Sequence, residues 1–258
     1  MLINAVIIIL REVLEASLIM GVLLALSQLN LLSKTWCVKA VILGVLGAVV
    51  YAVNLAIISA LHDGVGQEIV NTALYVFIFI FVLLIIYGLR DKQYSNVAIA
   101  AMFACVALAV VREGSEIIVY IHGFSTIPEL FTPILIGSSI GAGIGLSMGV
   151  FIYYLIVNLP FLYGVRFSFI VLVFIAGGMV SQATQMLLQA DLISSDLPIW
   201  DTSHIVSEQS IVGQILFAMM GYEATPILLQ VVLYVFSILL TGFLGISSIK
   251  HTKRLRLS

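Results

Sequence analysis

The chain has 258 residues, of which 62% are hydrophobic and 9% are charged, and its formal net charge is -2. Soluble globular proteins have about 45–50% apolar and about 25% charged residues, so the composition excludes a water-soluble core. A membrane span needs about 20 apolar residues in a helix, because no water reaches the backbone inside the bilayer. The composition therefore predicts an all-α polytopic membrane protein.

Taken in chain order, the apolar segments predict seven transmembrane helices. The breaks between them contain turn residues, such as His62-Asp63-Gly64 and Asn158-Leu159-Pro160. The first segment has no basic start and no small-residue cleavage site, so we expect no removable signal peptide. The predicted spans are 2–29, 36–61, 70–89, 96–122, 131–157, 167–190 and 226–248.

The basic residues predict the orientation of these spans. Nine of the eleven Lys and Arg fall in loops or the tail on one side, and the opposite loops have none. By the positive-inside rule the C-terminus is cytoplasmic and the N-terminus is outside, in a plasma or inner membrane. The nine residues are Lys34, Lys39, Arg90, Lys92, Arg166, Lys250, Lys253, Arg254 and Arg256.

The long outer connection before the last span is acidic. Its apolar segment 205–220 is too short to span and ends at Gly221, so we predict an interfacial or re-entrant helix there. Four of its acidic residues and one histidine either gather cations at the outer mouth or form a plain solvated loop. The residues concerned are Asp191, Asp196, Asp201, His204 and Glu208.

The two remaining basic residues, Arg11 and Arg112, begin the same motif. The first reads REVLE and the second REGSE, with carboxylates one and four residues after each arginine. With 3.6 residues per helical turn, each arginine shares a face with both carboxylates of its motif. The carboxylates are Glu12, Glu15, Glu113 and Glu116.

Both motifs lie deep in their predicted helices. Arg11 is nine residues from Leu2 and Arg112 is ten from His122, so each lies about 14 Å inside an apolar layer about 30 Å thick. One ionised side chain at that depth costs about 2.5–3.5 kcal/mol. The six charged residues must therefore pair with one another, face the interior and meet water or a cation.

The motifs are 101 residues apart, and the same shift carries the second and third spans onto the fifth and sixth. The chain thus reads as a duplicated three-helix unit, and because three is odd the copies are inverted in the membrane. Inverted repeats with a polar midplane site are typical of transporters. We expect one membrane domain, 1–258: repeats at about 1–90 and 91–190, an outer loop at about 191–225, a last span at about 226–248 and a basic tail at 249–258.

The chemistry of the two motifs favours a metal ion. Four carboxylates against two guanidiniums leave a formal charge of -2, which suits a hard, oxygen-preferring cation. Each arginine can pair with the carboxylate four residues on. Inert ion pairs that hold the bundle together are the second interpretation, but buried pairs are weak stabilisers and intramembrane ionisable residues are by default functional.

These motifs resemble the oxidase-dependent iron permeases, the family of the fungal high-affinity iron permease and its bacterial Efe-type relatives. REVLE in the first span and REGSE in the fourth carry the resemblance, as does PIWDTSHIVSEQSIVG followed by GYEATP before the last span. The resemblance covers the whole chain. It implies an iron permease in which Glu12, Glu15, Glu113 and Glu116 bind the ion and Arg11 and Arg112 support them.

The expected partners are iron, the lipid bilayer and a separate oxidising or iron-delivering protein, with no nucleic acid. The chain has no paired intramembrane histidines of a haem site and no Cys-His set of a copper oxidase, so we expect no cofactor, and any redox step belongs to another protein. No nucleophile and base stand together near the motifs, so we expect no enzyme.

Two other functions stay open on the sequence. A proton-coupled or other divalent cation transporter also uses midplane carboxylates, and a seven-helix receptor is the alternative from another class. Gln182, Gln185 and Gln189 lie at helical spacing in the sixth span. They either line the ion path or, as we favour, form hydrogen bonds between helices.

Overall fold

The computed structural model describes residues 2–194 and 197–257; the side chains of Lys92 and of residues 250–257 lie outside the description, as does Asp196 of the outer loop. The described chain is helical and contains no strand, as predicted. Its α-helices are α1 (Leu2–Leu29), α2 (Thr35–Val53), α3 (Leu55–Ser59), α4 (Gly66–Gly88), α5 (Ser95–Gly123), α6 (Pro128–Val157), α7 (Phe161–Gln189), α8 (Ile211–Met220) and α9 (Leu228–Leu257).

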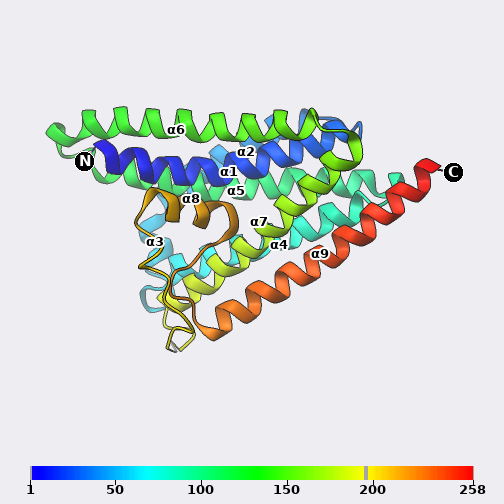
Figure 1. Ribbon diagram of the computed structural model, residues 1–258. Helices are drawn as coiled ribbons and strands as arrows, with labels where there is room; N and C mark the ends of the chain where they lie inside the picture. Colours follow the sequence, from blue (N-terminus) through cyan, green and yellow to red (C-terminus); the bar gives the residue numbers. More distant parts are fainter. Residues whose placement is uncertain (1, 195–196, 258) are drawn as a thin grey trace.

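Six of these helices are long and apolar enough to cross a membrane by length and composition: α2, α4, α5, α6, α7 and the part of α9 at Leu228–Ile249. The chain is therefore a polytopic membrane protein. The first helix, α1, has 28 residues and carries Arg11, Glu12 and Glu15. It lies beside α6 (Figure 1). It is not among the six candidate spans, so its place as a seventh span stays a prediction.

Most helix boundaries lie within about six residues of the predicted ones, and three regions differ. The last helix, α9, continues to Leu257, nine residues past the predicted end of the last span at 248 and into the predicted tail. The second span, predicted as 36–61, ends at Val53, because the chain bends at Asn54 before the short α3. The outer apolar segment becomes helical at Ile211 rather than Ile205. There the Ser210 hydroxyl accepts a hydrogen bond from the Gly213 amide, and Gly221 with φ 67° ends the helix.

The helices pair across the two halves of the chain. The first helix packs most extensively against α6, α2 packs most extensively against α5, and α4 and α7 pack against each other. Small residues make these close approaches possible. A Cβ on Gly141 would lie 2.5 Å from the Val6 carbonyl oxygen of α1, and one on Gly44 would lie 2.9 Å from the Ala107 carbonyl oxygen of α5.

The small residues of the two pairs occupy matching positions. Ala40, Gly44 and Ala48 are buried in α2, and Gly141, Gly145 and Gly149 are buried in α6. A shift of 101 residues, the separation of the two charged motifs, superposes one set on the other in the sequence. A duplicated unit predicts this pattern when the first helix of each half packs against the second helix of the other half.

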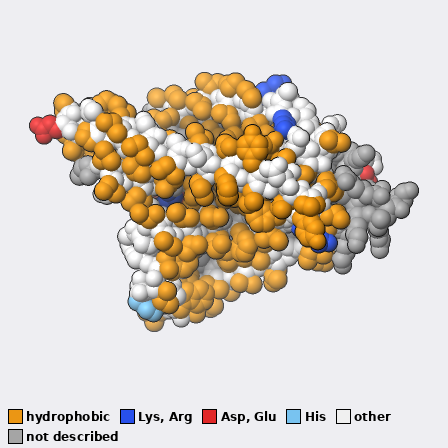
Figure 2. Space-filling view, turned by 45° about the horizontal axis from the view of Figure 1, so that its top comes forward, with side chains coloured by type: hydrophobic (Ala, Val, Ile, Leu, Met, Phe, Trp, Pro, Cys, Tyr) orange, Lys and Arg blue, Asp and Glu red, His pale blue; other side chains and the backbone are white. Residues whose placement is uncertain are grey.

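The two ends of the bundle differ in which links they carry. The links after α1, α4 and α6 lie at the end near the C-terminus, and the N-terminus and the remaining links lie at the other end (Figure 1). Figure 2 shows a largely hydrophobic face with few charged side chains between the ends. A bundle with this surface suits a lipid environment, because apolar side chains meet the hydrocarbon.

Candidate metal site

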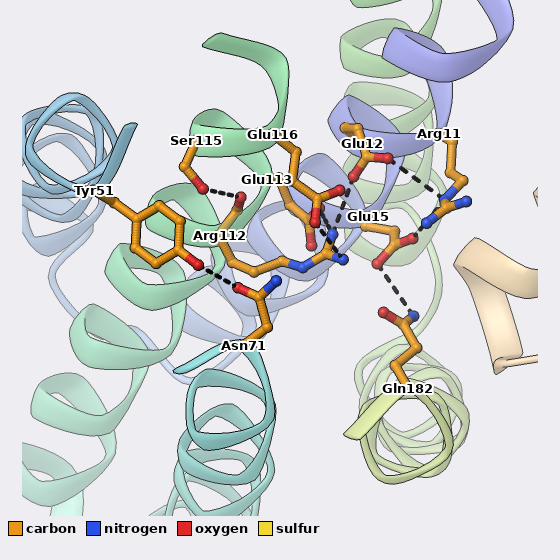
Figure 3. Close-up of polar contacts among 10 residues, drawn as sticks. All are labelled: Arg11, Glu12, Glu15, Tyr51, Asn71, Arg112, Glu113, Ser115, Glu116 and Gln182. Carbon is orange, nitrogen blue, oxygen red and sulfur yellow. Dashed lines mark hydrogen bonds and ion pairs between the residues drawn. The ribbon is translucent and has the colours of Figure 1, made fainter. Parts of the chain in front are cut away.

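Arg112 lies at the centre of a buried charged cluster between α1 and α5 (Figure 3). Its Nη1 atom lies 3.1 Å from Glu12 Oε2 of α1 and also contacts Glu113. Its Nη2 atom lies 2.9 Å from Glu116 Oε1, one helical turn on. One guanidinium therefore joins carboxylates from both sequence motifs, and only 2% of this side chain is exposed.

Three of the four predicted ligands converge. Glu12, Glu113 and Glu116 each offer a carboxylate oxygen, and these oxygens lie within 4.8 Å of one another. Within the residues described, this is the one group of three or more side chains that could hold a metal ion. The acids that the structure describes between α7 and α9 form no such group, and Asp191, Asp201 and His204 are exposed.

The first motif is arranged differently. Arg11 lies 3.6 Å from both Glu12 and Glu15, measured from Nε, and 32% of its side chain is exposed. Glu15 lies outside the group of three and instead accepts a hydrogen bond of 3.2 Å from Gln182 Nε2 of α7. The structure therefore places Glu15 beside the cluster, held by Arg11 and Gln182.

An aromatic ring covers each arginine. The Arg112 guanidinium carbon lies 4.8 Å from the ring centre of Tyr75 in α4, and that of Arg11 lies 4.7 Å from the ring centre of Phe217 in α8. Such stacking favours a cation whose hydration has been removed. The sequence analysis missed both rings, because nothing in the sequence shows which aromatic residue faces a distant arginine.

The polar residues near the cluster have separate roles. Ser115 donates a hydrogen bond to the Arg112 carbonyl of its own helix, and Tyr51 donates one to Asn71 at 3.1 Å (Figure 3). Gln182 bonds between helices, as we favoured, but to a carboxylate of the cluster. Gln189 is exposed at the end of α7.

Gln185, one turn from Gln182, contacts a residue outside the cluster. Its Nε2 atom lies 3.3 Å from Glu223 Oε2 in the link before α9. Burial, together with the neighbouring Glu208, raises the pKa of Glu223 to about 7. Glu208 also accepts a hydrogen bond from the Ala224 amide. Glu208 and Glu223 thus form an acidic pair within the link before α9, whereas Asp191, Asp201 and His204 are exposed.

The cluster has the chemistry of a site for a hard cation. Its four carboxylates and two guanidiniums carry a formal charge of -2, and the three convergent groups are oxygen donors. A six-coordinate ion with metal–oxygen distances of about 2.1 Å holds adjacent oxygens about 3 Å apart. Rotation of the glutamate side chains would bring the oxygens to that spacing, with Arg112 giving up its contacts to them.

Comparison with known proteins identifies the family of the chain. Residues 88–249 match the model of the Iron permease FTR1 family, and this stretch includes the second motif, α6, α7 and the outer link. No curated protein and no solved structure matches the chain. Because the family match spans more than half of the 258 residues, the chain belongs to the Iron permease FTR1 family.

Proposed function

We propose that the protein imports iron through a site in the middle of the membrane, where Glu12, Glu113 and Glu116 bind the ion. The observation that carries this proposal is the convergence of the three carboxylates from two helices, with Arg112 in contact with all of them. A guanidinium in that place offsets the repulsion between the carboxylates until the ion arrives. Glu15 is a fourth ligand that joins after release from Arg11 and Gln182.

We propose further that α1–α4 and α5–α7 are inverted repeats that move relative to each other around this site. The exchanged pairing of α1 with α6 and of α2 with α5 supports this, as does the matching register of their small residues. Inverted repeats of this kind let a transporter expose one fixed site to each side in turn. The positions of the basic links support an outside N-terminus and a cytoplasmic C-terminus.

The direct test is uptake of radiolabelled iron in cells that lack their own high-affinity importer. Glu12→Gln removes one charge from the group of three without changing the side chain's size, and we expect uptake to fall to background. The matched control is Glu129→Gln, the same change at an exposed position at the start of α6. Equal uptake by both variants at equal membrane expression would contradict the proposed site.

The cargo is tested by competition. Excess unlabelled iron should suppress uptake, while Ca²⁺ and Mg²⁺ should not, and Zn²⁺ or Mn²⁺ that suppressed uptake equally well would favour a general divalent cation transporter. The separate oxidising or iron-delivering partner remains a proposal from the family. It is tested by whether the chain alone, in vesicles, takes up ferric as well as ferrous iron.

A further inference from the structure

A cavity of about 270 Å³ lies between α1, α2, α4 and α5, directly beside the cluster. It lies in the half of the bundle that holds the N-terminus and the link between α2 and α4. Several of its lining residues carry polar groups that an ion could contact, although most of the surface exposed to the cavity is apolar. The lining includes Glu12, Tyr51, Asn71, Ser115, Glu116 and Tyr120.

The three convergent carboxylates differ in their access to this cavity. Glu116 and Glu12 line it, and Glu113 does not. The side chain of Glu116 is 31% exposed, whereas those of Glu12 and Glu113 are 5% and 3% exposed. An ion that arrives through the cavity therefore meets Glu116 first and reaches Glu113 last.

The opposite half of the bundle is closed at the equivalent place. Six positions that line the cavity have equivalents 101 residues away in the other repeat. The equivalents of Glu116, Val119, Tyr120, Tyr51, Leu55 and Asn71 are, in the same order, Glu15, Leu18, Ile19, Ile152, Ile156 and Leu172. All six of these residues are buried, and the five apolar ones belong to one continuous core. We call these five residues the inner plug. An ion cannot pass through close-packed apolar side chains.

A second cavity, of about 250 Å³, lies between α1 and α6 in the half nearer the C-terminus. Its lining contains no residue of the charged cluster. It does contain Lys34, whose ammonium group donates a hydrogen bond to Tyr153 and would repel a cation. This cavity therefore gives the ion no second route to the site in the conformation described.

We propose that the cavity beside Glu116 is the outer vestibule through which iron reaches the site, with Glu116 as its first ligand and the inner plug as the closed opposite gate. This inference rests on the proposed function and adds the route, the order of binding and the conformation. The structure is thus the outward-facing member of an alternating pair. Movement of the repeats would open the plug around Glu15 and close the vestibule around Glu116.

The test is cysteine accessibility at one matched pair of positions. Val119 lines the vestibule, and Leu18 is its repeat equivalent in the inner plug. The two native cysteines, Cys37 and Cys105, are buried and are first replaced by alanine. Each position then receives a cysteine, and a membrane-impermeant, positively charged thiol reagent is added to intact cells and, separately, to inside-out vesicles.

We expect Val119→Cys to react from outside about tenfold or more faster than Leu18→Cys, because reaction at Leu18 requires the plug to open. Ferrous iron should slow the reaction at Val119→Cys, and adding Glu116→Gln should remove this protection. Reaction of Val119→Cys only from the inside, or no faster than Leu18→Cys, would overturn the proposal, as would iron protection that survives Glu116→Gln.

The outcomes separate the route from the function. If the cysteine-free parent takes up iron while Val119→Cys fails these tests, the route is wrong and the proposed function stands. If the parent takes up no iron but native protein does, the double alanine replacement is at fault and Cys37→Ser with Cys105→Ser takes its place. If native protein takes up no iron, the proposed function is wrong. If Val119→Cys reacts from outside but iron does not protect it, the cavity is not the route of the iron.

Discussion

The two charged motifs have nearly the same sequence pattern but different surroundings. Arg112 of the second motif is 2% exposed and contacts three carboxylates, whereas Arg11 of the first is 32% exposed and lies 3.6 Å from two. In a symmetric pair of motifs, both arginines would have the same exposure and the same number of carboxylate contacts. In the conformation described, the second motif forms the centre of the charged cluster, and the first motif contacts Gln182 of α7 and Phe217 of α8.

The largest expected effect separates the two arginines. Arg112→Met leaves the buried carboxylates of Glu12 and Glu113 without this cation. Loss of one partner from a buried charge pair costs about 3–5 kcal/mol, much of a typical protein's stability of about 5–15 kcal/mol. Arg11→Met should cost less, because Arg11 contacts two carboxylates rather than three, at 3.6 Å, and 32% of its own side chain is exposed. Size-exclusion chromatography after heating detergent-solubilised protein measures the difference.

A second substitution tests whether charge imbalance causes the loss of stability in Arg112→Met. If charge imbalance causes the loss, then Glu113→Gln in the Arg112→Met background should restore part of the thermal stability, because it removes one of the carboxylates left unpaired. Equal losses for the two arginine variants, or no recovery in the double variant, would show that Arg112 acts through packing against Tyr75 rather than through charge.

The second effect separates the carboxylates. Glu113 belongs to the group of three, whereas Glu15 lies outside it. We expect Glu113→Gln to lower iron uptake about 100-fold and Glu15→Gln about tenfold, the range that loss of metal-supporting groups produces. Both changes keep the side chain's size, so surface expression should match the native level. A larger loss for Glu15→Gln would make the first motif, not the second, the centre of the site.

The third effect concerns Gln182, a positioning residue for Glu15. Gln182→Leu removes a hydrogen bond to a buried carboxylate, which is worth about 1.5–3 kcal/mol, so we expect uptake to fall about tenfold. Gln189→Leu, an exposed position on the same helix, should change nothing. The decisive measurement is the double variant: Gln182→Leu should have little further effect once Glu15 is Gln. Additive losses would assign Gln182 a role independent of Glu15.

The sequence predicted the helices well because span length and apolar composition are local properties. The glycines buried in α6 recur every four residues, a local pattern that favours close helix packing. The ion pairs were predicted in part. Each arginine lies near the carboxylate four residues on, as predicted. Arg112 also reaches Glu12 of α1, and such a contact depends on how α1 and α5 cross rather than on residue spacing.

The aromatic rings that lie over the two arginines could not be predicted from the sequence either. Tyr75 and Phe217 lie 37 residues before Arg112 and 206 residues after Arg11 in the chain, and no period or motif links a ring to a cation at such distances. The segment from Ile205 to Met220 predicted an outer helix, and α8 forms there. Its contact with Arg11 follows from the tertiary fold, in which α8 packs against α1 and α7.

The smallest effect contrasts the membrane cluster with the acidic pair in the outer link. Glu223 has a pKa of about 7, above its ordinary 4.5, because it is buried and lies near Glu208. The folded protein therefore holds this proton more tightly than the unfolded chain, and stability falls as pH rises from about 4.5 to about 7. Glu223→Gln should remove this part of the pH dependence and raise the melting temperature of purified protein at pH 8 more than at pH 5. Glu129→Gln, at an exposed acid, should leave the pH profile unchanged; if both variants shift it equally, the pair in the outer link does not cause the dependence.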